Sequence, residues 1–247
     1  MRSLVISRRK IGFITIITVI LSLLIYIWNV QIMPSFVRSG TYFMVHTQQK
    51  VVALTFDDGP DPAFTEPILD ILKQKQVKAT FFVLGENARR NPSLLRRMVK
   101  EGHEIGNHSY THNYNQNQNK MVAELKQTDE VVYEATGMHT HFYRPPGGYA
   151  SKKLIEAIKK QDYIFTLWSI DSKDWRRPGI DRIVDNVMSK ISPGVIILFH
   201  DGGGFRSQTV EALGQIIDAL RTNGYHFVTL SELKALDSVS NDNVFSH

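Results

Sequence analysis

Residues 51–60 read VVALTFDDGP, a short apolar run followed by two acids, a glycine and a proline. The apolar part predicts a strand, which ends at Asp57 and Asp58. A helix with apolar residues at helical spacing is predicted over 66–76, and a second strand over 79–84. This order of strand, helix and strand is typical of a parallel sheet with helices outside.

The same alternation continues towards the C-terminus. Further strands are expected over 103–106, 142–144, 164–168, 195–199 and 226–229, and further helices over 92–101, 120–136, 152–160, 180–189 and 208–222. About seven or eight such units in roughly 200 residues suit a (β/α) barrel better than two small sheets. We therefore predict one α/β domain over residues 46–236, with a stalk over 31–45 before it and a mobile tail over 237–247 after it.

The N-terminal region has the pattern of a membrane anchor. Residues 1–10 are a basic flank without acids, and residues 11–30 contain no charged residue. A helix of that length spans roughly 30 Å, the thickness of a bilayer core. Tyr26 and Trp28 suit its far interface, and the positive-inside rule places residues 31–247 outside the cell. We predict a single-pass protein of the cell membrane with its folded domain extracytoplasmic.

Two alternatives to an anchor remain. A cleaved signal peptide normally has an apolar region of about 7–15 residues, followed by a small-residue cleavage site. Here the apolar run is longer, and Gln31-Ile32-Met33-Pro34 follows it without such a site. A core helix with no polar face would require burial on all sides.

Charge and cysteine content exclude several classes of function. The formal charge is +5, but residues 1–30 contain four basic residues and no acid, which leaves 25 basic and 24 acidic residues elsewhere. We therefore expect no nucleic-acid partner. The chain contains no cysteine. Any metal must consequently be held by histidine, aspartate or glutamate.

Residues capable of chemistry recur where the predicted strands end. In a barrel, functional residues lie on the loops after the carboxyl ends of the strands. These positions hold Asp57 and Asp58, His108 and His112, Arg144, Asp171 and Asp174, and His200 and Asp201. Each also has an ordinary interpretation: a solvated acid or helix cap, a surface histidine, a surface charge or a core histidine. Their coincidence at the same end of one sheet indicates a site.

Five motifs in this order resemble those of the NodB-homology polysaccharide deacetylases, carbohydrate esterase family 4. They are TFDDGP (55–60), HSYTH (108–112), RPPG (144–147), DSKDW (171–175) and LFH (198–200). The match spans about residues 50–230, and TFDDGP with a downstream HSxxH is highly specific. The resemblance implies a distorted (β/α) barrel and metal-dependent removal of N-acetyl groups from amino sugars.

The resemblance also implies a metal site formed by Asp58, His108 and His112. Two neutral imidazoles and one carboxylate suit a catalytic Zn²⁺ with open positions, although Co²⁺, Ni²⁺ or Mn²⁺ would also fit. Asp57 would be the general base that takes a proton from the attacking water, and Arg144 would pair with it. Adjacent side chains on an extended chain point to opposite sides, so the two neighbouring acids can have different roles.

The other motifs imply how the reaction ends. His200 would protonate the leaving amine, and Asp174 would hold its imidazolium. A backbone N–H at the turn of Gly147 would stabilise the oxyanion, and Trp175 would form a wall of the sugar groove. Family members often have tyrosine where Gly147 stands, a departure that could widen the groove.

These observations lead to one preferred function and two alternatives. We expect a hydrolase that removes N-acetyl groups from N-acetylglucosamine-type residues of a cell-wall polysaccharide, with peptidoglycan as the preferred substrate. The same site could act on chitin oligomers, another exopolysaccharide, or a small amide or ester. A non-catalytic carbohydrate-binding protein is a third interpretation. The complete set of base, ligand and acid residues argues against it.

Overall fold

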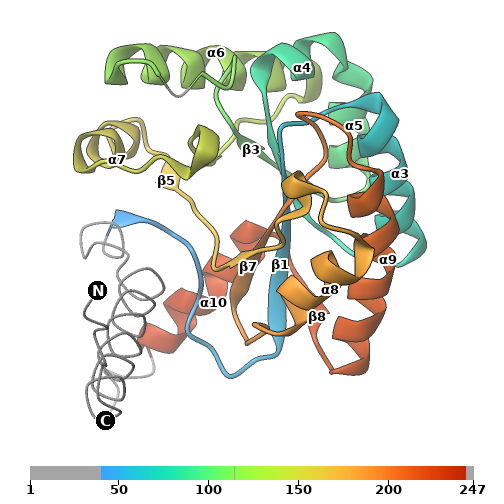
Figure 1. Ribbon diagram of the computed structural model, residues 1–247. Coiled ribbons are helices and arrows are strands. Elements are labelled where there is room, and N and C mark those ends of the chain that lie inside the picture. Colours follow the sequence, from blue (N-terminus) through green and yellow to red (C-terminus); the bar gives the residue numbers. More distant parts are fainter. Residues whose placement is uncertain (1–39, 114, 243–247) are drawn as a thin grey trace, which may run out of the picture. The chain divides into compact units, whose positions relative to one another are not determined.

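The computed structural model describes residues 40–242 except residue 114. Its centre is a curled sheet in which neighbouring strands are parallel, with helices around it (Figure 1). The strand order is β5-β4-β3-β2-β1-β7-β6, and β8 pairs with β1. The strands are β1 (Val51–Asp57), β2 (Thr80–Val83), β3 (Glu104–Asn107), β4 (Phe142–Tyr143), β5 (Ile164–Phe165), β6 (Ile170–Asp171), β7 (Val195–His200) and β8 (His226–Phe227).

Most of the helices alternate with these strands, as the sequence predicts, but α4 and α5 both follow β2, and no α-helix separates β5 from β6. They are α3 (Pro62–Gln74), α4 (Gly85–Arg90), α5 (Pro92–Lys100), α6 (Gln118–Thr136), α7 (Lys152–Lys159), α8 (Ile180–Met188), α9 (Ser207–Thr222) and α10 (Leu230–Asp242), with short 3₁₀ turns η1 (Pro146–Gly148) and η2 (Asp174–Arg176). Because β5 and β6 form the two ends of the strand order, the fold is a half-barrel of the (β/α) type.

Strand β1 holds the centre of the sheet. All seven of its residues are buried, because β2 and β7 pair with it on either side. The ring of Phe56 stacks on Phe81 of β2 at 5.1 Å and on Phe199 of β7 at 5.7 Å between centroids. Aromatic packing on both sides fixes the strand end that carries Asp57.

The strand expected over 164–168 is present but shorter, and a second strand that was not expected follows it. The chain forms β5, which pairs with β4, and then β6, which pairs with β7 at the opposite end of the sheet. Between them, Leu167 N–H donates to the carbonyl of Tyr42, and Ser169 N–H donates to that of Ile196. Backbone partners far apart in the sequence therefore decide the path of this apolar run.

The C-terminal part of the range predicted as a stalk, 31–45, belongs to the domain, because residues 42–45 pair and pack with it. Tyr42 forms a bridge with Thr166, and Met44 forms one with Val195 at the start of β7. Val45 is buried in a core cluster, against which Tyr42 packs. This segment therefore lies between the end of β5 and the start of β7.

Two helices were not expected from the sequence. The first, α4, begins at Gly85, where a Cβ atom would lie 2.3 Å from the ring of Tyr110. The second, α10, buries Leu230 and Leu233 and runs into the segment 237–247 that was expected to be a tail. Apolar residues three apart packing against the core explain why the chain remains helical there.

The predicted anchor over 11–30 lies outside the described residues. Within the described part of the chain, no helix is long and apolar enough to cross a membrane.

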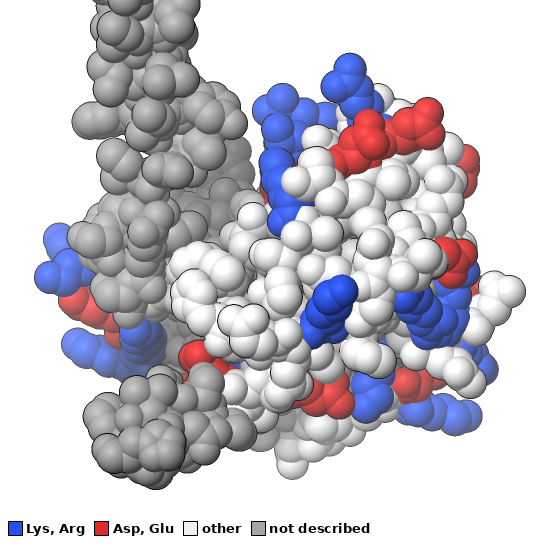
Figure 2. Space-filling view, turned by 90° about the horizontal axis from the view of Figure 1, so that it is seen from below, with Lys and Arg blue, Asp and Glu red and all other residues white. Residues whose placement is uncertain are grey.

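Figure 2 shows Lys and Arg side chains interspersed with Asp and Glu on the lower face of the domain. This mixture agrees with the near-balance of charge beyond residue 30.

Candidate active site

The carboxyl ends of the central strands bring the motif residues together. In the register of β1 and β7, Asp57 is the partner of His200. His108 follows β3 directly, and its N–H donates to the carbonyl of Val83 at the end of β2. Residues from distant parts of the sequence therefore converge at one edge of the sheet, as expected for a parallel fold.

Asp58, His108 and His112 form a group that could hold a metal ion, with their ligand atoms all within 4.8 Å of one another. The Nε2 atoms of His108 and His112 each lie 3.3 Å from Oδ1 of Asp58. That oxygen is buried and accepts no hydrogen bond within the described residues. A buried carboxylate oxygen facing two imidazole nitrogens fits a divalent metal bound by one oxygen and two nitrogens.

The surroundings of the group prepare it for this role. Nδ1 of His108 lies 2.8 Å from the carbonyl oxygen of Arg144, so its N–H donates there and Nε2 faces Asp58. Such an outer hydrogen bond sets the tautomer and the ring orientation of a ligand histidine. Asp58 and His112 have positive φ angles of 75° and 61°, a conformation uncommon for residues other than glycine. Strained backbone of this kind concentrates at functional sites.

The charges of the site favour a cation. Burial alone would raise the pKa of Asp58, but contact with His108 and the neighbouring histidines lower it below its ordinary value. Burial alone would lower the pKa of His108, but the charge of Asp57 and contact with Asp58 raise it. Both directions show that positive charge beside these two buried carboxylates is stabilised.

Arg144 positions Asp57. Its Nη1 donates to Oδ1 of Asp57 at 2.7 Å and to the hydroxyl of Thr55 at 2.9 Å, and Nη2 donates to the carbonyl of Leu167 at 3.0 Å. Its guanidinium also lies 4.0 Å from the ring centroid of Phe82. Burial lowers the pKa of Arg144, and Asp57 opposes this shift. A fully buried guanidinium with this many partners holds the carboxylate in one orientation.

A second pair, Asp174 and His200, lies on the other side of β1. Oδ1 of Asp174 lies 2.7 Å from Nδ1 of His200, and Oδ2 accepts from the backbone N–H of His200 and the hydroxyl of Thr209, both at 2.8 Å. Burial alone would lower the pKa of His200, but Asp174 outweighs it and the pKa rises to about 9. His200 can therefore carry a proton at neutral pH.

Five of these residues line one cavity of about 690 Å³, whereas Arg144 and Asp174 do not reach its surface: the five are Asp57, Asp58, His108, His112 and His200. The motif residues Asp171 and Leu198 also line it, and outside the motifs its walls include Trp168, Arg206 and the exposed ring of Tyr149. The expected groove residues Gly147 and Trp175 also line it, and Trp175 is 45% exposed. Tyr149 and Arg206 lie outside the recognised motifs and were missed. For Tyr149, its place directly after Gly147 and Gly148 was the available signal.

The turn at Gly147 offers a backbone donor. Gly147 has a φ of 61°, and its N–H has no hydrogen bond among the described residues, whereas Gly148 N–H donates to Pro145. A Cβ atom on Gly148 would lie 2.6 Å from the ring of Trp168, so the turn packs tightly against the cavity wall. An unpaired N–H beside the histidine and carboxylate groups has the chemistry of an oxyanion donor.

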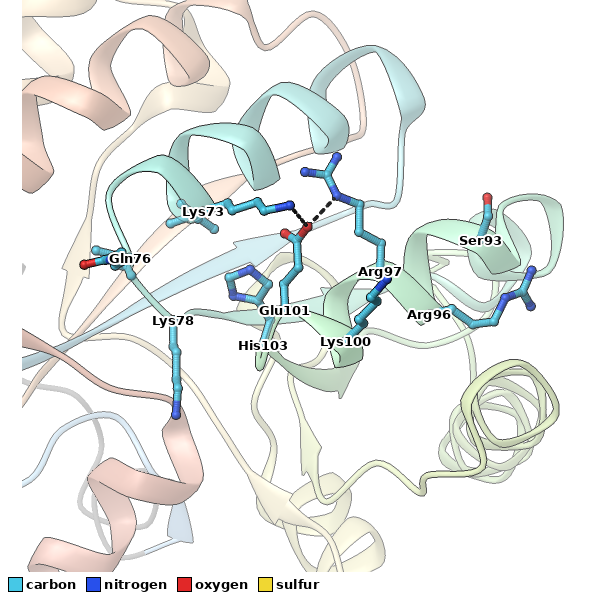
Figure 3. A pocket seen from close by; sticks show the side chains of 11 residues that line it. Lys73, Gln76, Lys78, Ser93, Arg96, Arg97, Lys100, Glu101 and His103 are labelled. Carbon is cyan, nitrogen blue, oxygen red and sulfur yellow. Dashed lines mark hydrogen bonds and ion pairs between the residues drawn. The ribbon is translucent and has the colours of Figure 1, made fainter.

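A larger cavity elsewhere lacks this chemistry. It measures about 830 Å³ and is lined by basic residues of α3 and α5 (Figure 3). Its acid, Glu101, lies 3.1 Å from Arg97 and 3.6 Å from Lys73. This acid is already paired with two cations, and no metal-ligand group of the described residues lies there. We therefore assign the active site to the smaller cavity.

Comparisons with known proteins agree with this geometry. The polysaccharide deacetylase model matches residues 44–165. A peptidoglycan-N-acetylglucosamine deacetylase of Bacillus cereus is 43% identical over 192 residues, which cover 76% of this chain and 90% of the relative. A chitooligosaccharide deacetylase of Sinorhizobium fredii is 40% identical over 190 residues, with 70% of this chain and 87% of the relative covered.

A solved structure shows the same fold. It is the crystal structure of a peptidoglycan N-acetylglucosamine deacetylase in complex with 4-naphthalen-1-yl-N-oxidanyl-benzamide. Its TM-score is 0.77 at 39% identity, and the match covers 81% of this chain and 95% of that one. The chain therefore belongs to the NodB-homology polysaccharide deacetylases, carbohydrate esterase family 4.

Proposed function

We propose that this deacetylase removes N-acetyl groups from N-acetylglucosamine residues of peptidoglycan, with a divalent metal at Asp58, His108 and His112. The observation that carries the proposal is the register of β1 and β7, which sets Asp57 opposite His200 beside the three ligand side chains. A base and an acid on either side of a metal group are what hydrolysis of an unreactive amide requires.

Asp57 acts as the general base. An acetamido carbonyl is a poor electrophile and water a poor nucleophile, so the reaction needs help at both atoms. When bound, a divalent metal supplies Lewis acidity to the water and to the carbonyl oxygen. Asp57 takes a proton from the attacking water while Arg144, 2.7 Å away, keeps its carboxylate aimed. The donor set favours Zn²⁺, and Co²⁺, Ni²⁺ and Mn²⁺ remain alternatives.

His200 completes the reaction. Attack of water turns the carbonyl oxygen into an oxyanion, to which the N–H of Gly147 donates. His200 then gives a proton to the amide nitrogen, the C–N bond breaks, and acetate and a free amine result. Asp174 stabilises the imidazolium before this transfer, because its carboxylate lies 2.7 Å from Nδ1. Trp175 offers an apolar face to a sugar ring at the mouth of the cavity.

Peptidoglycan is the preferred substrate because the relative from Bacillus cereus and the crystal structure carry that activity in their names. A second candidate is the chitooligosaccharide, because the relative from Sinorhizobium fredii is named for it and is nearly as similar. The two polymers share the N-acetylglucosamine unit on which the catalytic residues would act.

An acetate-release assay on peptidoglycan, chitin oligomers and acetylated xylan, run side by side, tests the proposal. We expect acetate from peptidoglycan at the highest kcat/KM, and less from chitin oligomers. Higher kcat/KM on chitin oligomers would favour the second candidate. Release from acetylated xylan alone would contradict both, because xylan carries O-acetyl groups and no amide.

We also propose that residues 11–30 anchor the enzyme in the cell membrane with the catalytic domain outside. An uncharged run of that length behind a basic flank supports this orientation. A cell-wall substrate would lie on the same side as the domain. The stalk before residue 40 would give the cavity access to the polymer.

A further inference from the structure

Arg206 is a buried cation in the wall of the catalytic cavity. It is 6% exposed and immediately precedes α9. Its Nε donates to the carbonyl of Gly202 at 2.8 Å, and Nη2 donates to that of Gly203 at 3.1 Å. Both carbonyls belong to the loop that follows His200. The loop therefore holds the guanidinium in one place at the edge of the site.

No acid of the described residues pairs with this guanidinium. The acids that line the cavity are engaged elsewhere: Asp57 with Arg144 at 2.7 Å, Asp58 with two histidines, and Asp171 with the backbone N–H of Lys173 at 2.7 Å. Taking an ion out of water costs several kcal/mol unless a counter-charge is present. Two carbonyl groups offset only part of that cost for Arg206.

The donor geometry indicates what could complete the pairing. A guanidinium has five N–H groups in a rigid fork, and the two loop contacts use only part of them. Planar donors of this kind match a carboxylate, which accepts two parallel hydrogen bonds. The rim next to the cavity is also basic, because exposed Lys173 and Arg177 flank Trp175, and the guanidinium of Arg176 lies 4.6 Å from its ring centroid.

We infer that Arg206 binds the free lactyl carboxylate of a peptide-free N-acetylmuramic acid next to the reacting N-acetylglucosamine, so that the site prefers such an acidic glycan to a neutral one. The inference rests on the proposed deacetylase function and concerns substrate choice. Arg206 is the binding residue for the carboxylate, while Asp57 and His200 act on the acetamido group. Neutral chitin oligomers would leave the guanidinium unpaired and would therefore bind more weakly.

The test compares two substrates that share the same sugars and differ in whether the lactyl group is charged. The first is a tetrasaccharide of alternating N-acetylglucosamine and N-acetylmuramic acid with free lactyl carboxylates, and the second is its methyl ester. We expect wild-type kcat/KM to be about 10- to 100-fold higher for the acid, the range for a hydrogen bond to a charged group. In Arg206→Gln this preference falls close to one, and in Arg206→Lys it is intermediate.

The preference is a ratio measured on one protein sample, so partial unfolding or metal loss in a variant cancels. Arg221→Gln is the matched control, because Arg221 also donates to backbone carbonyls and loses the same charge, but lies at the other end of α9 outside the cavity. Its ratio should equal that of the wild type. Equal wild-type kcat/KM for acid and ester would overturn the inference, as would an unchanged ratio in Arg206→Gln. Absence of acetate from both substrates would instead contradict the proposed function.

Discussion

Asp57 and Asp58 are adjacent in the chain, yet their side chains meet different partners. Asp57 accepts from Arg144 and ends β1 in an extended conformation, whereas Asp58 has a φ of 75° and faces two imidazoles. The change of backbone conformation between the two residues separates the carboxylates. One can therefore accept a proton while the other binds a metal.

Substitution of Asp57 itself and of His108, which faces Asp58, should separate the two roles. In Asp57→Asn we expect the bound metal to remain and acetate release to fall by about 10²- to 10⁴-fold, the usual contribution of a general base. In His108→Ala most of the metal should be lost. Elemental analysis and an acetate assay of both variants measure this. Equal metal loss in the two variants would show that the roles are wrongly assigned. The control is Asp70→Asn, which removes the charge of an exposed acid on α3.

The His200–Asp174 pair predicts a pH dependence. His200 must be protonated to act as an acid, so kcat/KM should fall as the pH rises through its raised pKa of about 9. Asp174→Asn removes the charge that raises this pKa, so the falling limb should move to lower pH. Complete pH profiles of both enzymes test this. Coincident falling limbs would mean that Asp174 does not control the titrating acid.

At the scale of single residues, the sequence predicted much of the cavity. Asp57, His108 and His200 could be found because each stands at the end of a predicted strand, and such ends share one edge of a parallel sheet. Arg206 could not, because it follows the glycines of a loop whose path depends on contacts with other strands. Its lack of an acid partner is a property of the folded chain only.

At the scale of elements, strands and helices with strong periodicity were predictable, and short ones were not. Strand β1 was predictable because its sequence is a nearly continuous apolar run, and the structure buries all seven of its residues. Strands β5 and β6 have two residues each, and their pairing depends on Tyr42 and Ile196 far away in the chain. Local sequence carries too little information to place such pieces.

The η1 turn between β4 and α7 should be sensitive to a single methyl group. In Gly148→Ala the new Cβ would meet the ring of Trp168, and the φ of 69° disfavours alanine. We expect the turn to move and kcat to fall by about 10-fold or more, since a displaced oxyanion donor can cost 10²- to 10³-fold. Metal content should not change.

The control for this prediction is Gly137→Ala at the end of α6. Gly137 has a φ of 73°, but a Cβ atom there would meet nothing within 4 Å. This variant carries the same backbone penalty without a collision, so it should lose stability but not kcat. Wild-type kcat in Gly148→Ala would contradict the role of the turn.

At the scale of the whole molecule, the account joins a catalytic half-barrel to a membrane anchor. If residues 11–30 are retained, the intact N-terminal segment should be found in the membrane fraction of cells. Mass spectrometry of that fraction measures the N-terminus of the protein directly. A new N-terminus near residue 31 would show that the segment is cleaved and would contradict the anchor.

The central claim is that this cavity hydrolyses the amide of an N-acetylated amino sugar with Asp57 as the base. Counting both products of one reaction on purified peptidoglycan tests this claim most directly. We predict one new primary amine for each acetate released by the wild type, and about 10²- to 10⁴-fold less of both products from the metal-loaded Asp57→Asn variant. Acetate without new amines, or wild-type release by the variant, would contradict the account.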